Sequence, residues 1–476
     1  MSNEAIYNKH PLESLSGNPL IEALHIEIDV NALIKRMTCK VDNDVNVMGL
    51  PSVYKNALVQ ELSLIHVPLP QFTSLYNKCA TMLLTSYKHR NPAGAESNAL
   101  KHSLGEQFHN KTKFLTALPV QRTTAPSILL HGVSGTGKTT AIRNVLSCFQ
   151  QVIEHSQYDS KFFKQSQLVW LSIDLPATPS LKALALNFFQ AVDEACGTDY
   201  YDCWKDKNRL SVDQHLNAMR MTAENHSLGL IHIDEMQFML NYAKSKDAPN
   251  MTVLEALFNK IGIPVLLSCT SDGVSLFRPD IHNGLSLTPN MTTTRRMCSD
   301  REFRFSTHKL DSDYFCSLFQ ALFPWGLTEL SDADVARFKE VFFSLSCGLP
   351  AIMTRLARLF YELKFELMDK STKQHQRYSA DTEIRLLRSV YKNQFSLINP
   401  AMQMLRQGMH EQYEKSVRSH SKVNPAFTNN EQKTAKAAAR STVPEVVKGE
   451  KIINPIEGDD DVLKGDIPTG FAKEGA

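Results

Sequence analysis

The chain has 476 residues, of which 42% are hydrophobic and 21% charged, and its formal net charge is +2. This length and composition allow a full hydrophobic core and predict two or three domains. The near-neutral charge neither demands nor excludes nucleic acid, so any such contact must come from local basic patches.

The composition also argues against several classes of protein. The nine cysteines are scattered without a C-x-x-C pair, so neither zinc knuckles nor a disulfide scaffold is indicated. No stretch approaches the roughly 18 uninterrupted apolar residues of a membrane span, and the start lacks the basic and apolar regions of a signal peptide. We therefore expect a cytoplasmic protein without membrane contact.

Two segments are predicted ahead of the core. Residues 1–51 are expected to be an irregular N-terminal extension, in which Asn18 to Leu24 form a short docking segment. Residues 52–126 show apolar side chains at helical spacing and are expected to form a helical N-terminal segment. One of its helices should end at Arg90-Asn91-Pro92, because proline cannot continue a helix.

A complete phosphate-binding motif follows a short apolar run at residues 127–131. The motif and the residue after it are Gly132, Val133, Ser134, Gly135, Thr136, Gly137, Lys138, Thr139 and Thr140. Glycines let consecutive backbone N–H groups close around the phosphates of ATP, the lysine supplies a point charge, and the hydroxyl of Thr139 can ligate Mg²⁺. The periodicity after Thr139 predicts a helix with apolar residues up to Val152 and Ile153 on one face.

A second motif places two carboxylates at the end of an apolar strand. Leu228 to Ile233 is mostly apolar and is followed by Asp234 and Glu235. Asp234 is expected to hold the water shell of Mg²⁺, and Glu235 is expected to polarise the water that attacks the γ-phosphate. The alternative for this pair is a solvated strand end.

Strand and helix patterns alternate from residue 127 to about 310, which predicts an α/β fold with a parallel five-stranded sheet and flanking helices. The expected strands are Ser127 to His131, Leu168 to Ile173, Leu228 to Ile233, Ile263 to Cys269 and Phe303 to Thr307. Residues 311–410 show helical patterns only and predict a small helical lid domain. Residues 411–476 hold few large apolar side chains and predict a flexible, disordered C-terminal tail.

An α/β core with these two motifs, followed by a helical domain, resembles the AAA+ ATPases. The resemblance implies a polar residue beside the γ-phosphate at the end of the fourth strand, where Thr270 is the candidate and Ser268 the alternative. It also implies a sensor arginine in the helical domain. Arg355 is the candidate for that role, and Arg358 lies on the same helix.

The same resemblance implies that an arginine of the neighbouring subunit completes each site. Arg295 and Arg296 lie shortly before the fifth strand, where such an arginine is expected. A guanidinium aimed at the γ-phosphate stabilises the charge that develops during transfer. A solvated loop pair is the alternative, and three other arginines compete for the role, namely Arg278, Arg301 and Arg304.

Further segments are similar to the TnsC-type regulators of heteromeric bacterial transposons. They are Asn18 to Leu24, Tyr87 with Arg90 to Pro92, Ser180 to Ala183 with Leu186 to Phe189, Ile233 to Gln237, Ile261 to Val265, and Arg295 with Arg296. Members of that family can carry a longer C-terminal region that contacts the endonuclease and transposase subunits. The short tail of low complexity expected here departs from that pattern.

The resemblance implies an ATP-dependent homo-oligomer, a ring or a helical filament, around double-stranded DNA in the bacterial cytoplasm. A target-selection protein would recruit it, transposase and endonuclease subunits would read it, and ATP hydrolysis would drive its disassembly. DNA contacts should be to the backbone and independent of base sequence. The candidates are Lys182, Thr178 and Ser180, for which a surface position or a helix cap is the alternative.

Two other classes of ATPase stay as alternatives. An AAA+ replication initiator or helicase loader has the same core and lid, but such proteins usually append a helix-turn-helix module, and no helical pattern for one follows residue 410. A small-molecule P-loop kinase is disfavoured by Asp234 with Glu235, by the paired arginines and by the helical domain.

Overall fold

The structure is a computed structural model that describes most of the chain. The described residues are 4–41, 47–114, 125–178, 180–207, 209–241, 251–258, 261–277, 301–325, 327, 330–370, 379–410, 412, 413 and 416. All of them belong to one compact unit, Met1–Ser419. None of the helices in these ranges combines the length and the apolar character that crossing a membrane requires.

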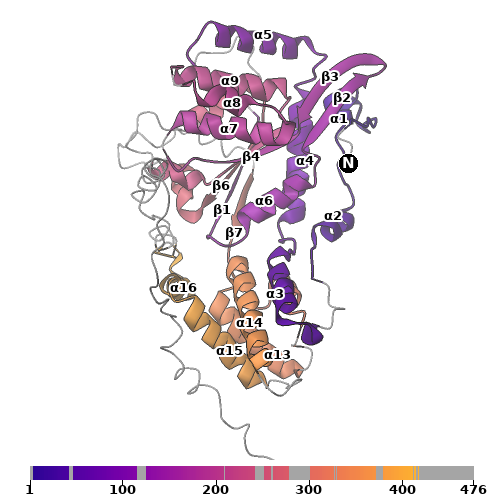
Figure 1. The fold of residues 1–476 in the computed structure, drawn as a ribbon. Helices are drawn as coiled ribbons and strands as arrows, with labels where there is room; N and C mark the ends of the chain where they lie inside the picture. Colours follow the sequence, from indigo (N-terminus) through magenta and orange to yellow (C-terminus); the bar gives the residue numbers. More distant parts are fainter. Residues whose placement is uncertain are drawn as a thin grey trace, which may run out of the picture. The chain divides into compact units, whose positions relative to one another are not determined.

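A parallel five-stranded sheet forms the centre of this unit, in the order β4-β5-β6-β1-β7 (Figure 1). Its strands are β1 (Ser127–Gly132), β4 (Trp170–Asp174), β5 (Leu230–Asp234), β6 (Val265–Thr270) and β7 (Arg301–Phe305). Each neighbouring pair is parallel. The prediction of five parallel strands is therefore confirmed. Because β6 lies between β1 and β5, the carboxyl ends of these three strands meet at one edge.

The strands are apolar on both faces because helices cover both faces. In β1, Ile128 and Leu130 belong to one hydrophobic core, whereas Leu129 belongs to a second core on the other face. The first core is covered by α4 (Phe72–Lys88) and α6 (Lys138–Ser147), and the second by α7 (Leu181–Cys196), α9 (Val212–Asn225) and α10 (Met251–Leu257). Figure 1 shows α5 (Ala95–His109) and α8 (Tyr200–Lys205) on the α7 and α9 side.

The helix after the phosphate-binding loop is shorter than predicted. α6 ends at Ser147, and the prediction that it continues to Ile153 is wrong. Val152 instead begins β2 (Val152–Tyr158), which pairs with β3 (Lys161–Leu168) in an antiparallel hairpin. Asp159 and Ser160 turn the hairpin with positive φ values of 47° and 62°, the backbone twist that two-residue hairpin loops favour. The apolar residues after Ser147 fit a helix face and a strand equally well, and tertiary packing decides between them.

Two further boundaries differ from the predictions. Leu168 ends β3 and does not begin β4, which starts at Trp170. The N-terminal extension, predicted to be irregular, contains short helices, namely α1 (Pro19–Glu22) and α2 (Val30–Met37). Asn18 caps α1 through the backbone N–H of Leu20, so this segment is ordered by its own cap.

The region after β7 is helical, as predicted. Its helices are α12 (Asp313–Leu322), α13 (Asp332–Ser346), α14 (Pro350–Lys370), α15 (Ala380–Gln394) and α16 (Asn399–Arg406). Serine side chains cap three of them, namely Ser312, Ser331 and Ser379. An aromatic cluster that includes Phe323, Phe338 and Phe360 packs between them. The predicted domain boundaries stay predictions, and the tail after 416 lies outside the described residues.

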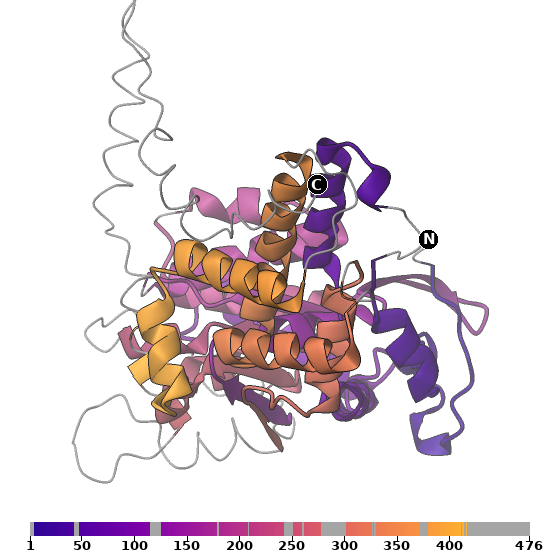
Figure 2. The ribbon, with the colours of Figure 1, turned by 90° about the horizontal axis from the view of Figure 1, so that it is seen from below.

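The N-terminal helix α3 (Ser52–Glu61) packs against α14 rather than against the sheet. Lys55 forms an ion pair of 2.6 Å with Asp369, and the Gln60 amide donates to Glu362 at 2.8 Å. The purple α3 lies beside the orange α14 in both views (Figures 1 and 2). The segment that leads into the core is thus attached to the helical region as well.

Gly229, just before β5, lies where two other segments approach it closely. An added Cβ would lie 2.5 Å from the Val169 carbonyl and would also meet the buried hydroxyl of Tyr87, which is bound to the Ser227 carbonyl. We expect Gly229→Ala to destabilise the protein by about 1–3 kcal/mol, as overpacking does. Thermal unfolding measures this. Gly105→Ala in α5 is the control, because no atom lies within 4 Å of its added Cβ. Equal melting temperatures for the two variants would contradict the close approach.

Candidate functional site

A cavity of about 620 Å³ opens where β1, β5 and β6 end. It brings together residues from the phosphate-binding loop, the carboxylate motif, the end of β6, α14 and the N-terminal segment. The predicted site residues that line it are Ser134, Gly135, Gly137, Lys138, Thr139, Thr140, Asp234, Glu235, Thr270 and Arg355. Residues far apart in the sequence therefore share one surface.

The loop between β1 and α6 has the conformation that a phosphate cradle requires. Gly135 and Gly137 have φ values of +85° and +86°, a region that other residues adopt only with strain. Gly137 is the residue before α6, so the loop runs directly into the N-terminus of a helix, whose free N–H groups attract anions. The Thr136 hydroxyl donates to the Val133 carbonyl at 2.7 Å and closes the turn. The loop fits a nucleotide triphosphate.

The Lys138 ammonium lies inside this loop. It donates to the Gly132 and Val133 carbonyls at 2.7 and 2.9 Å, and the residue is buried. These bonds hold the charge at the place where the phosphates of a nucleotide would add stronger, charge-assisted acceptors.

Thr139 and Asp234 meet across the cavity, with the Thr139 hydroxyl donating to Asp234 Oδ2 at 2.7 Å. Burial alone would raise the pKa of Asp234. The hydrogen bonds from Ser268, Thr139 and the Glu235 backbone nevertheless hold this pKa below its usual value, so the carboxylate is ionised. A hydroxyl and an ionised carboxylate are the oxygen ligands that Mg²⁺ and its water shell prefer. Bound there with ATP, Mg²⁺ would neutralise charge on the β- and γ-phosphates.

Glu235 follows in an unusual backbone conformation, with φ at 59°. Gln237 donates from its amide to Glu235 Oε2, and its amide oxygen accepts from the Thr270 backbone N–H at 3.2 Å. Burial, together with the charges of Asp234 and Asp174, raises the pKa of Glu235. A raised pKa makes this carboxylate a better proton acceptor than an ordinary glutamate.

Of the two candidates on β6, Thr270 lines the cavity and Ser268 does not. Ser268 is completely buried and donates to Asp234 Oδ1 from inside the sheet. The alternation of side chains along the strand points residues two apart to the same side, but only the last of them reaches the strand end. Thr270 thus lies where a residue that orients the attacking water is needed.

The arginines divide into three groups. Arg295, Arg296 and Arg278 lie outside the described residues. Arg301 and Arg304 are exposed on β7 and do not line the cavity, and Arg301 donates to the Ser74 hydroxyl at 2.7 Å. Two arginines of α14 line the cavity, as described next.

Arg355 and Arg358 reach the cavity from one turn of α14. Arg355 donates to the Gln394 carbonyl at 3.1 Å and lies over the Phe395 ring at 4.7 Å. Arg358 Nε lies 3.7 Å from the Glu362 carboxylate. Both guanidiniums are therefore held by the helical region itself at the rim of the cavity.

One wall of the cavity was missed by sequence reasoning. Residues of the segment before α4 form it, namely Ser63, Ile65, His66, Val67 and Leu69. His66 Nδ1 is bound to the Met37 carbonyl at 2.6 Å, which fixes the segment. Nothing local marks these residues, because their role follows from where α3 and α4 place them. Their apolar side chains offer a surface on which a nucleotide base can pack.

The helical region closes the cavity from the other side. The Ala351 backbone N–H donates to the Gly135 carbonyl at 3.3 Å, and the Tyr413 hydroxyl donates to the Ser134 carbonyl at 3.2 Å. The phosphate-binding loop is therefore bonded directly to the helical region.

The three predicted DNA contacts lie away from the cavity, around the start of α7. Ser180 caps this helix by accepting the Ala183 backbone N–H at 3.2 Å. Lys182 is half-buried in its first turn, and Thr178 is exposed. The cap expected as the alternative for Ser180 is present.

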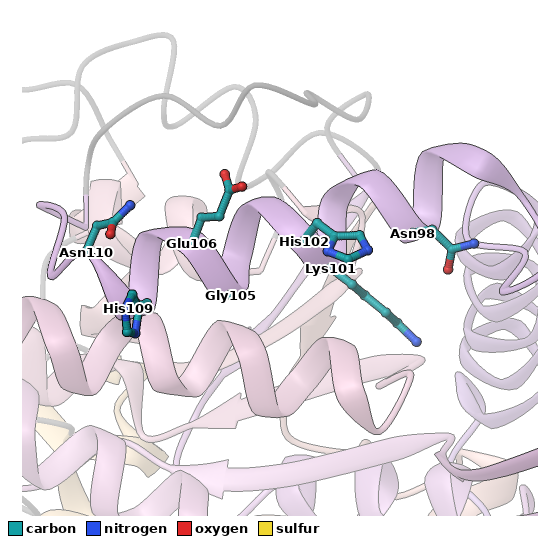
Figure 3. Close-up of a pocket in the computed structure, with 7 residues that line it drawn as sticks. All are labelled: Asn98, Lys101, His102, Gly105, Glu106, His109 and Asn110. Carbon is teal, nitrogen blue, oxygen red and sulfur yellow. The ribbon is translucent and has the colours of Figure 1, made fainter.

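A second hollow of about 500 Å³ runs along α5 (Figure 3). The residues that line it come from this helix and its C-cap, and they are Asn98, Lys101, His102, Gly105, Glu106, His109 and Asn110. Among the described residues no group from another element converges on it, so it does not compare with the first cavity.

The sequence of the core matches a known family. Residues 121–276 match the AAA domain. The protein is therefore a nucleotide-binding P-loop ATPase with an AAA+ fold. No curated protein matches the chain.

Several solved structures are similar to this ATPase at low identity. A Walker-type ATPase of Pyrococcus abyssi is 14% identical over 66% of this chain and 74% of that chain, with a TM-score of 0.36. The ORC2 protein of Aeropyrum pernix is 16% identical over 63% and 67%, with a TM-score of 0.35. The ORC1 protein of Aeropyrum pernix in complex with DNA is 14% identical over 67% and 76%, with a TM-score of 0.34.

We expect Glu235→Gln to bind ATP with unchanged affinity and to hydrolyse it about 10²–10⁴-fold more slowly, because the amide cannot accept a proton. Steady-state phosphate release and equilibrium nucleotide binding measure the two effects. Glu340→Gln, on the exposed face of α13, is the control and should hydrolyse ATP at the normal rate. Normal turnover in Glu235→Gln would remove Glu235 from the role of base.

The raised pKa of Glu235 predicts the acid side of the pH–rate profile. Hydrolysis needs the carboxylate, so the rate should fall as the pH drops through the raised pKa. The fall in rate should therefore occur at a pH above about 4.3, which is the pKa of an ordinary glutamate. The residual rate of Glu235→Gln should lack that acid limb. An acid limb at the same pH in both proteins would assign it to another group.

Proposed function

We propose that this ATPase is a TnsC-type regulator of DNA transposition. It assembles with ATP into a ring or helical filament on double-stranded DNA in the bacterial cytoplasm. It links a target-selection protein to transposase and endonuclease subunits, and ATP hydrolysis drives its disassembly. The boundaries proposed for its parts are the extension 1–51, the helical segment 52–126, the ATPase domain 127–310, the lid 311–410 and the tail 411–476.

The observation that carries this proposal is the meeting of segments that resemble the family outside the phosphate motifs. The Asn18 amide donates to the Tyr87 carbonyl at 2.7 Å, and the Asn91 amide donates to the Gly17 carbonyl at 3.1 Å. The Arg90 guanidinium lies 3.9 Å from the Glu224 carboxylate and donates to Ser86 at 2.8 Å. Two segments that are weak signals separately thus form one polar joint, in which the bonds of Asn18 and Arg90 are buried, and this supports a common origin over chance similarity.

The arginine side chains that line the cavity support assembly through an ATP site shared between two subunits. Among the described lining residues, the arginines are Arg355 and Arg358, and the protein's own helices hold both. A guanidinium aimed at the γ-phosphate would come from a neighbouring copy, and Arg295 and Arg296 are the candidates. A site completed in trans makes subunit association depend on nucleotide.

Backbone contact with DNA is proposed for the start of α7. Lys182 stands in the first turn of this helix, and Thr178 precedes its cap. A lysine and a hydroxyl beside a helix N-terminus are groups that bind phosphates without reading bases.

The test uses purified full-length protein, duplex DNA and a non-hydrolysable ATP analogue. We expect DNA-bound oligomers with regular repeats in electron micrographs and their loss when ADP replaces the analogue. A protein that stays monomeric under all these conditions would contradict the proposal. Binding restricted to one DNA sequence, with loading of a helicase, would favour the replication initiator or loader instead, and phosphate transfer to a small acceptor would favour a kinase.

Lys182→Ala should weaken DNA binding equally for unrelated sequences. It should also reduce the slope of log K against the logarithm of the salt concentration by about 1, the change expected for the loss of one phosphate contact. Fluorescence anisotropy at several salt concentrations measures this. Lys392→Ala, an exposed lysine of α15, is the matched control. If both variants keep the wild-type slope, DNA does not contact Lys182.

A further inference from the structure

A continuous chain of hydrogen bonds runs inside the sheet behind the carboxylate motif. Ser172 Oγ lies 2.8 Å from His232 Nδ1, and His232 Nε2 lies 2.9 Å from Ser268 Oγ. Ser268 then donates to Asp234 Oδ1. These residues stand on the adjacent strands β4, β5 and β6, where Ser172 and His232 are register partners. His232 and Ser268 are completely buried.

The carboxylate of Asp234, at the end of this chain of hydrogen bonds, determines which group donates in the bonds that lead to it. An ionised Asp234 only accepts hydrogen bonds, so Ser268 must give it its single hydroxyl proton. The Ser268 oxygen is then the acceptor for His232, which requires the proton on Nε2. His232 Nδ1 is bonded to the Ser172 hydroxyl on the other side of the ring. With Nε2 as the donor, Ser268 keeps its own proton for Asp234.

The two oxygens of Asp234 have different surroundings, one inside the sheet and one at the cavity. Oδ1 accepts from Ser268 and from the Glu235 backbone N–H at 2.8 Å. Oδ2 accepts from the Thr139 hydroxyl, which lies in the cavity. Two donors on Oδ1 fix the rotation of the carboxylate, so that Oδ2 is presented to the cavity and to the hydroxyl of the phosphate-binding loop.

We propose that His232 is a positioning residue for this carboxylate: through Ser268 it orients Asp234 to receive the divalent cation that accompanies ATP. The inference rests on the metal role proposed for Asp234. An apolar side chain would serve packing at least as well at position 232, because this position is completely buried and Leu230, two residues before it on the same face of β5, is apolar and completely buried. A buried imidazole is instead costly unless both nitrogens are bonded, as both are here.

The test measures metal binding directly. Mn²⁺ replaces Mg²⁺, and its affinity for the complex of protein and non-hydrolysable ATP analogue is determined by electron paramagnetic resonance. We expect His232→Leu to weaken Mn²⁺ binding about 10-fold, the scale on which residues behind a metal ligand act. Nucleotide affinity measured in excess chelator should stay at the wild-type value. His232→Gln, which keeps a donor near the position of Nε2, should restore part of the Mn²⁺ affinity.

A double-mutant cycle locates the effect in the chain. Ser268→Ala should weaken Mn²⁺ binding about as much as His232→Leu, and the double variant should be no weaker than the worse single variant, because both changes break one path. Ile231→Val removes one buried methyl group from the same strand, so it is the control for a change in packing and should keep wild-type Mn²⁺ affinity.

Asp234→Asn separates the inference from the proposed site. If Asp234→Asn weakens Mn²⁺ binding and His232→Leu does not, His232 serves packing only and the inference is overturned. If Asp234→Asn itself leaves Mn²⁺ affinity unchanged, the metal role of Asp234 fails. Additive losses in the double variant would also overturn the inference, because they would show two independent paths.

Discussion

The hydrogen bond between the Thr139 hydroxyl and Asp234 joins two motifs that lie 95 residues apart in the sequence. It forms because β1 and β5 end at the same edge of a parallel sheet with β6 between them. The cavity, the lysine within the loop and the polar residue at the end of β6 all take their positions from this edge. A sheet with β1 and β5 at opposite edges would separate the phosphate-binding loop from the carboxylates.

The interior of the sheet is mostly apolar, but it also contains polar groups. These groups form hydrogen bonds with one another. His232, Ser268 and Asp234 lie on neighbouring strands, and each bonds the next. A buried polar group without a partner costs roughly 1–3 kcal/mol, whereas a fully bonded set rigidifies its surroundings. The same network therefore explains how the sheet tolerates a histidine and why one oxygen of Asp234 has a fixed direction.

Both ends of α14 make contacts that bear on the nucleotide. Near its start, the Ala351 N–H meets the Gly135 carbonyl of the phosphate-binding loop. Near its end, Asp369 holds Lys55 of α3, and the residues after α3 form a wall of the cavity. A helix of 21 residues spans about 30 Å. One helix thus joins the phosphate-binding loop, near its start, to the helix that precedes a wall of the cavity, near its end.

Local sequence patterns were sufficient to predict the motifs of the site and the main elements of the core. The strand before Gly132, the glycine loop, the carboxylates after β5 and the alternation of strands with helices follow from periodicity and from the backbone freedom of glycine. These features gave the fold class and the residues that line the cavity from the motifs. Apolar periodicity likewise predicted the helical region.

Tertiary packing decided the remainder. The residues after Ser147 suited a helix or a strand, and pairing with β3 made Val152 begin a strand. The wall from Ser63 to Leu69 carries no motif, because it reaches the cavity only through the docking of α3 on α14. His232 interrupts an apolar strand in the sequence, and its partners Ser172 and Ser268 become visible only when the strand order sets them side by side. Contacts between strands depend on register across the whole chain, which no local pattern encodes.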